Sequence, residues 1–285
     1  METSLYLASK IIPMQSILDI VQNFGPLEKL AWVFFCLTLF WIVESVAPLF
    51  RMRYNRLRHL GINMVFFSFM MVINLIFGFL FVMAYPLVET YHFGLLNWIA
   101  LPWWVEIIIA IMAFDFISQY LAHYLLHKVK WMWKLHLVHH ADTKVDATTG
   151  TRQHPGEFVL RETLALITLV LFGIPIGVYL FYRLITIFFT YWTHANIGLP
   201  RWLDNVLSYV FVTPLMHKFH HHFERPWTDS NYGNVLSIWD RLFGTFSTGN
   251  PQKIKYGVDT VDNSRDEDLG YQLGFPFNKD IKTDY

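Results

Sequence analysis

Three long apolar runs, at residues 30–50, 62–86 and 103–126, dominate this sequence. Each run has at least the roughly 20 residues that an α-helix needs to cross a hydrocarbon layer of about 30 Å. The composition agrees, because 54% of the residues are hydrophobic and only 15% are charged. We therefore predict an all-α integral membrane protein, built as a helical bundle, rather than a soluble domain.

A fourth apolar stretch, residues 158–192, is interrupted by Gly173, Pro175 and Gly177. Its two halves are short for full crossings, so we predict a re-entrant or short helical hairpin. Nearer the N-terminus, apolar residues recur at helical spacing over residues 13–24, which favours a short helix at the membrane interface. The prediction is thus three full spans, a hairpin and a histidine-rich, metal-binding cap.

The basic residues predict the orientation. Four arginines stand between residues 51 and 58, after the first run, whereas the loop 87–102 contains no lysine or arginine. By the positive-inside rule, the N-terminus lies outside and the histidine-rich part faces the cytoplasm, in a bacterial inner membrane or an ER membrane. Glu2 stands where a signal peptide would have basic residues, so we interpret the N-terminus as that of the mature protein. The formal net charge is zero, so no binding to nucleic acid is expected.

Eleven of the 13 histidines fall between residues 123 and 222. Most of them form three motifs, HYLLH at 123–127, HLVHH at 136–140 and HKFHH at 217–221, in which side chains one helical turn apart share a face. Metal coordination is the expected reason, because each neutral imidazole gives a lone pair to an ion and no acceptor is left unmatched. Eight such ligands are too many for one tetrahedral ion, so two ions are predicted.

Three further histidines are not expected to bind metal. His222 follows the last motif but points away from its shared face, so we leave it out of the ligand set. His59 and His92 stand in or beside loops, and we interpret both as common interfacial residues.

Spacing alone does not identify the metal, because imidazole suits Zn, Cu, Fe and Ni. The zinc-protease motif HExxH is absent, and so is the pair of Glu-x-x-His motifs on helices that marks soluble di-iron bundles. A bis-histidine haem protein is one alternative, although adjacent His-His pairs suit it poorly. A histidine-rich metal transporter or scaffold is another. It would need polar residues along its spans, and the first two runs contain few, chiefly Glu44, Asn63 and Asn74.

Taken together, the three motifs resemble the fatty acid hydroxylase/sterol desaturase superfamily of integral membrane di-iron enzymes. The resemblance covers roughly residues 104–275 and includes the run NYGNVLSIWDRLFGTF at 231–246. The stretches YWTHANIGLP and TPLMHKFHHH are most similar to the alkylglycerol monooxygenase branch and its bacterial relatives.

The resemblance implies two iron ions (Fe2+/Fe3+) that use O2 and two electrons to hydroxylate or desaturate a lipid C–H bond. It also implies His194 as a further ligand, although Thr190 stands where many relatives have another histidine. The implied metal ligands are His123, His127, His136, His139, His140, His194, His217, His220 and His221.

The remaining implications concern partners and substrate. The chain has no GxGxxG motif after a strand and no cysteine cluster, so a separate reductase, ferredoxin or cytochrome is expected to supply the electrons. Sterols, fatty acyl chains, alkyl glycerol ethers and carotenoids remain open as substrates. A non-hydroxylating relative, such as an aldehyde-processing enzyme, would share the same motifs.

Four further residues are candidates for supporting roles. Asp115 and Gln119 precede His123 at intervals of four and share its helix face. With Asn196 they are candidates for hydrogen bonds that orient imidazoles, and the resemblance gives His154 such a role or one in substrate binding.

The chain is expected to divide into three parts. These are an N-terminal part with the interfacial helix and two spans at 1–102, a membrane-embedded catalytic domain at 103–275 and a C-terminal tail at 276–285. In the run 231–246 we expect a short helix with an apolar face, ended by Gly244 and anchored by Asp240 and Arg241.

Overall fold

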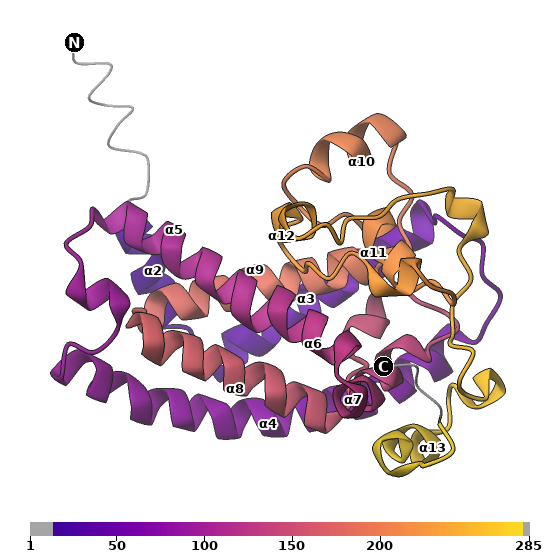
Figure 1. The fold of residues 1–285 in the computed structure, drawn as a ribbon, viewed down its shortest axis with the longest axis horizontal. Coiled ribbons are helices and arrows are strands. Elements are labelled where there is room, and N and C mark those ends of the chain that lie inside the picture. The colour runs from indigo at the N-terminus through magenta and orange to yellow at the C-terminus, as the bar shows by residue number, and fades with distance from the viewer. Residues whose placement is uncertain (1–13, 282–285) are drawn as a thin grey trace.

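The structure is a computed structural model that describes residues 14–281, so the expectation about the extreme N-terminus falls outside it. The described residues form helices and no β-strand, and their only strand-like pairings are two isolated bridges, Pro48–Ile197 and Phe211–Leu236. The prediction of an all-α fold is therefore confirmed for this part of the chain. The long helices lie beside one another, and the shorter helices α10 to α13 gather at one end of the molecule (Figure 1).

The α-helices are α2 Met14–Gln22, α3 Pro26–Val46, α4 Arg56–Thr90, α5 Trp103–Phe114, α6 Ala122–Lys128, α7 Lys130–His140, α8 Pro155–Phe172, α9 Ile176–His194, α10 Arg201–Leu207, α11 Pro214–His220, α12 Ile238–Leu242 and α13 Leu269–Leu273. A π-helical segment, η2 Asp115–Leu121, joins α5 to α6. The short 3-10 helices are η1 Leu95–Trp98, η3 Ala147–Thr151, η4 Trp227–Asp229, η5 Pro251–Lys253, η6 Asn263–Arg265 and η7 Phe275–Phe277.

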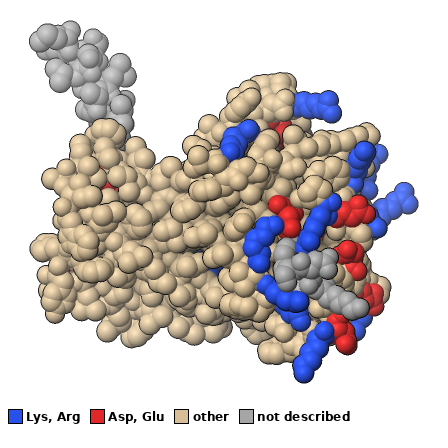
Figure 2. Space-filling model, viewed as in Figure 1, with Lys and Arg blue, Asp and Glu red and all other residues tan. Residues whose placement is uncertain are grey.

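Four helical segments are long and apolar enough to cross a membrane: α3, the segment Arg56–Trp98, the segment Trp103–Lys128, and α9. The first three correspond to the three predicted spans. The hairpin is present as α8 and α9, but the expectation that both of its halves are too short is wrong for α9, whose 19 residues qualify by length and hydropathy. Figure 2 shows that charged side chains are rare over the long helices and gather at the end of the molecule where the short helices lie.

A tight turn at Gly173 joins the two helices of the hairpin. Gly173 has φ 68° and ends α8 in the left-handed conformation. A Cβ atom at this position would lie 2.5 Å from Asn97 Nδ2 and 2.7 Å from Phe93 O. Both the backbone angle and the close packing therefore require glycine here.

Replacing Gly173 with alanine is expected to lower the free energy of unfolding by about 1–3 kcal/mol, because the new methyl group meets the η1 loop and disfavours the left-handed angle. Thermal unfolding of the detergent-solubilised protein measures this effect. Gly61→Ala is the matched control, since a Cβ there meets nothing within 4 Å. Equal unfolding temperatures for the two variants would contradict the packing argument.

A buried polar network fixes the loop after α7 against the start of α4. His59 is fully buried, not interfacial as expected, and its Nε2 lies 3.0 Å from both carboxylate oxygens of Asp142. Its Nδ1 lies 3.2 Å from Asp146 Oδ2. Arg152, also fully buried, donates to Val138 O and to Asp266 O. These contacts hold the chain that follows the histidine-rich helix α7 against α4, against α7 itself and against Asp266.

The described end of the chain packs on the same helix. Phe275 and Ile281 are buried in a hydrophobic cluster with Trp133 and Leu137 of α7. The Lys134 ammonium donates to Asn278 O. Residues 276–281 of the predicted tail are thus part of the packed cap.

Candidate metal centre

The structure brings nine buried histidines into two groups, and within each group the imidazole nitrogens available as ligands lie within 4.8 Å of one another. Each of the nine side chains belongs to a residue that is at most 5% exposed. Group one consists of His123, His127, His136, His140 and His220, and group two consists of His139, His194, His217 and His221. These are the nine residues that the sequence singled out as ligands.

Helices α7 and α11 each contribute to both groups. On α7, His136 and His140 are four residues apart and join group one, whereas His139 joins group two. On α11 the division is reversed, because His220 joins group one while His217 joins group two. Each of the two HxxHH motifs, whose side chains were expected to share a helix face, therefore contributes to both groups.

In group two, the hydrogen bonds of the rings fix which nitrogens carry protons. His139 Nδ1 donates to Arg152 O at 3.1 Å, and His194 Nδ1 donates to Thr190 O at 2.6 Å. In the neutral rings both Nε2 atoms are then unprotonated, and they lie 2.9 Å apart. A third ring, His217, places its Nε2 3.0 Å from that of His194. Lone pairs facing one another at this distance repel unless a cation lies between them.

Protonation of one ring does not supply that cation. Burial, reinforced by the neighbouring His194, holds the pKa of His139 well below its usual value. Burial and the adjacent imidazoles also hold the pKa of His217 well below it. His221 of the same group has no hydrogen-bond partner at either ring nitrogen and is 1% exposed. These rings fit a bound metal ion, whose ligand atoms at about 2.1 Å would lie roughly 3 Å from one another.

Group one has the same construction. His123 Nδ1 donates to Tyr232 O at 2.8 Å, and His123 Nε2 lies 2.9 Å from His136 Nε2. His220 Nδ1 donates to Ser230 O at 2.7 Å, which leaves its Nε2 directed at His140 Nε2, 3.0 Å away. The rings are oriented by backbone carbonyls, as is usual for histidines that bind metals.

Glu157 supports group one and is not among the candidate residues predicted from the sequence. Its carboxylate is fully buried, and Oε1 lies 2.9 Å from His136 Nδ1. The same oxygen accepts from Arg161 Nε at 2.9 Å. A carboxylate beside the outer nitrogen of a ligating histidine fixes the ring and strengthens it as a donor to metal.

Replacing Glu157 with glutamine is expected to weaken metal binding at group one by about 10–100-fold, because the neutral amide loses the charge that polarises His136. Metal titration of the purified variant measures the loss. Glu28→Gln, at an exposed position on α3, is the control and should bind metal as the unchanged protein does. An unchanged affinity in Glu157→Gln would show that the carboxylate serves the fold alone.

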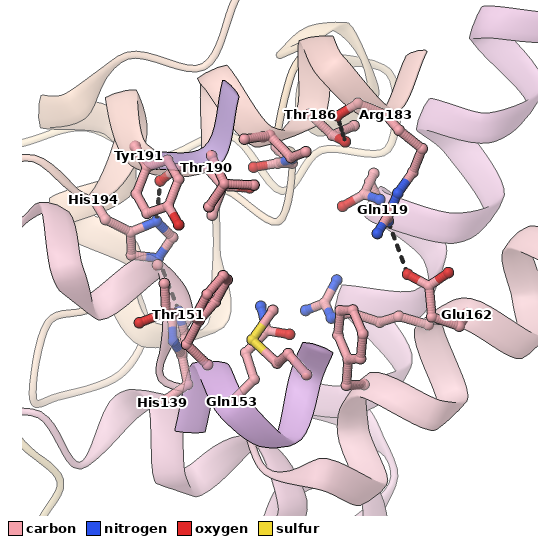
Figure 3. Close-up of a pocket in the computed structure, with 18 of the residues that line it drawn as sticks. Gln119, His139, Thr151, Gln153, Glu162, Arg183, Thr186, Thr190, Tyr191 and His194 are labelled. Carbon is pink, nitrogen blue, oxygen red and sulfur yellow. Dashed lines mark hydrogen bonds and ion pairs between the residues drawn. The ribbon is translucent and has the colours of Figure 1, made fainter. Parts of the chain in front are cut away.

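A cavity adjoins both groups (Figure 3). His123 of group one and His139, His194 and His217 of group two form part of its wall. Helices α3, α4, α8 and α9 provide much of the rest, with apolar side chains that include Val33, Phe67, Met70, Phe158 and Ile187. The two groups thus face a partly apolar space between the long helices.

Comparison with known proteins shows which family this site resembles. Residues 107–245 match the fatty acid hydroxylase family, and all nine histidines lie within the match. This segment, just under half of the chain, is similar to the fatty acid hydroxylase family. The resemblance seen in the sequence is therefore confirmed.

The names of individual relatives of the fatty acid hydroxylase segment refer to several different lipids. The chain is 30% identical over 155 residues to the ornithine lipid hydroxylase OlsE of Rhizobium tropici, covering 54% of this chain and 45% of that protein. It is 32% identical over 173 residues to human alkylglycerol monooxygenase, covering 60% and 36%, respectively. A cholesterol 25-hydroxylase-like protein of Danio rerio is 25% identical over 136 residues, covering 47% and 53%. The chain spans less than half of the first two relatives, and no solved structure matches it.

The run 231–246, at the end of the fatty acid hydroxylase segment, folds back against the π-helical part of the third span. Its short helix α12 is followed by Gly244 with φ 70°, as expected. Asp240 accepts from the backbone N–H groups of Tyr232 and Gly233, and Tyr232 O in turn holds His123. The expected apolar face is not buried, because Leu242 is 67% and Phe243 is 52% exposed. The polar anchor is therefore the main structural contribution of this run.

The four candidate supporting residues have different surroundings. Asp115 accepts from Tyr182 Oη, Trp239 Nε1 and Leu236 N, and so ties the run 231–246 to the third span. Gln119 lines the cavity.

The other two candidates bind backbone groups and orient no imidazole of the two groups. His154 Nδ1 accepts from Gly156 N at the start of α8, and the side chain of Asn196 binds both backbone groups of Phe50. His222, which we left out of the ligand set, accepts from Lys255 N outside both groups.

Proposed function

We propose that this protein is a membrane-embedded non-haem di-iron oxygenase that hydroxylates or desaturates a C–H bond of a lipid. The observation that carries the proposal is the pairing of unprotonated imidazole nitrogens, 2.9 Å apart in each group, within a fatty acid hydroxylase segment. Each group would hold one iron ion, and the nine histidines named above would be the ligands. Residues 103–275 would form the catalytic domain, with residues 1–102 anchoring it.

Iron suits this role better than zinc because zinc has no redox chemistry. When bound, iron supplies the activation of O2 and the removal of hydrogen from an unactivated carbon. The histidines would hold the ions, backbone carbonyls such as Arg152 O orient the imidazoles, and the cavity would place the lipid beside them. The apolar wall of the cavity excludes water from the reacting carbon.

The proposed substrate reaches the site from the bilayer. Four helices are able to cross the membrane, and the cavity lies between helices of this set. Met71, which lines the cavity from α4, is also 38% exposed on the surface of the long helices. We place the histidine groups on the cytoplasmic side and the N-terminus outside, on the distribution of lysine and arginine.

The two electrons are assigned to a separate reductase, ferredoxin or cytochrome. Trp133 supports an entry route on the cap, because its ring lies 4.8 Å from His127 and 5.3 Å from His140. Trp131 and Lys130, two and three residues earlier, are exposed on the surface. A donor bound there would lie near group one.

The experiment is metal analysis of the purified protein together with 18O2 labelling of membrane lipids in cells with and without the gene. About two iron ions per chain and an 18O-labelled or newly desaturated lipid that depends on the gene are expected. Stoichiometric zinc without oxygen consumption would contradict the proposal and favour a metal-binding transporter or scaffold.

A further inference from the structure

The cavity has a charged end, away from the histidines, in the middle of the long helices. Arg183 of α9 pairs with Glu162 of α8, with Nη1 and Oε1 2.8 Å apart, and also donates to Asn74 Oδ1 of α4 at 3.0 Å. All three residues line the cavity, and Figure 3 shows Arg183, Glu162 and Gln119 at one side of it with His139 and His194 at the other. Charged side chains buried between membrane-length helices are energetically costly and commonly mark a binding site.

Two buried acceptors in the cavity wall have no hydrogen-bond partner. They are Glu162 Oε2, on a residue that is 1% exposed, and Gln153 Oε1. Both residues line the cavity. A buried acceptor left unpaired costs about 1–3 kcal/mol, so a ligand that donates hydrogen bonds here is favoured.

The charges of the wall are already balanced. Arg183 is paired with Glu162, and Arg161 is paired with Glu157. An anionic group would be repelled by Glu162, and a cationic group would be repelled by Arg183. A hydroxyl group suits this wall because it is neutral and both donates and accepts hydrogen bonds.

We propose that the cavity binds the polar group of a lipid that carries free hydroxyl groups between Glu162, at the charged end, and Gln153, which Figure 3 shows between that end and His139, with these two residues as the acceptors that select it. The inference rests on the proposed function and narrows its substrate class. Arg183 precedes His194 by 11 residues on α9, about 16 Å of helix, so the polar group is held at a distance from the reacting carbon at the histidine end. A plain acyl or alkyl chain would leave both acceptors unpaired.

The test compares two probes that differ only in hydrogen-bond donors, 1-O-hexadecylglycerol and its 2,3-di-O-methyl ether. Binding to the full-length, metal-loaded protein is titrated by native mass spectrometry without electron donor, so no turnover occurs. The diol is expected to bind about 10-fold more tightly, as one to two hydrogen bonds would give. Equal dissociation constants would overturn the proposal and indicate that water alone occupies the polar end.

A pair of variants tests the residue assignment. Gln153→Met keeps the side-chain length but removes the acceptor oxygen, and it should reduce the preference for the diol several-fold. Met70→Leu, on the apolar wall, should change the affinity for both probes equally. Bound metal and unfolding temperature are measured for each variant to establish that it is folded. A Gln153→Met protein that is folded and keeps the full preference would refute the role of Gln153.

These results are independent of the oxidation assay. A protein that prefers the diol but neither incorporates 18O into a lipid nor desaturates one would retain the inference and refute the proposed function. A protein that oxidises lipid but binds both probes equally would retain the proposed function and refute the inference.

Discussion

Replacing His221 with alanine is expected to reduce bound metal from two ions per chain to one and to lower lipid oxidation at least ~100-fold. Changing residues that merely orient ligands typically costs 10–100-fold, and losing a ligand should cost more. His221 is well suited to this test because neither ring nitrogen has a hydrogen-bond partner in the protein. Its removal therefore takes away a ligand without breaking another polar contact.

His222 provides the matched control for this prediction. It is the next residue in the chain, yet its ring accepts from Lys255 N and packs against Trp227 outside both groups. His222→Ala should retain two ions and most of the activity. Metal analysis and product formation are measured on both variants side by side. If His222→Ala loses an ion while His221→Ala retains both, the division of the histidines is wrong.

Removing the metal is expected to destabilise the folded protein strongly. The two groups join α6, α7, α9 and α11, so binding energy at the ions contributes directly to the stability of the cap. With free metal at 1,000 times its dissociation constant, one site adds about 4 kcal/mol. For a domain of this size such a loss corresponds to roughly 10 °C in unfolding temperature.

The measurement is thermal unfolding of the solubilised protein before and after chelation, followed by addition of Fe2+. The unfolding temperature should fall on chelation and recover with the ion. The His221→Ala variant, with one site already impaired, should show a smaller fall. An unfolding temperature that chelation leaves unchanged would mean that the imidazole groups are stable without metal, contrary to the argument from their facing lone pairs.

The polar residues of the first two spans argue against a transporter. Glu44 forms an ion pair with Arg56 at 2.6 Å and accepts from Asn196 N. Asn63 donates to Thr148 Oγ1 at 2.7 Å. These side chains hold α3 and α4 to the segments that follow α7 and α9, two helices that carry candidate ligands. They serve assembly of the site and need no role in passing ions across a membrane.

Much of the fold and the ligand set could be predicted from the sequence because both depend on local properties. Helix length and hydropathy are carried by consecutive residues, so the runs at 30–50, 62–86 and 103–126 predicted three of the four membrane-length helices. The density of imidazole between His123 and His221 likewise predicted a metal centre without knowledge of the tertiary fold. All nine candidate ligands lie in the two groups that the structure forms.

The assignment of each histidine to a group depended on tertiary structure. Spacing shows which side chains share a face of α7, but it does not show that α6 packs beside His136 and α9 beside His139. Glu157 and His59 had no readable signal for the same reason, since their partners lie 21 and 83 residues away. Sequence alone thus determined the spans and the candidate metal-binding residues, whereas packing between helices decided how the imidazoles pair, because that pairing depends on contacts that no local pattern encodes.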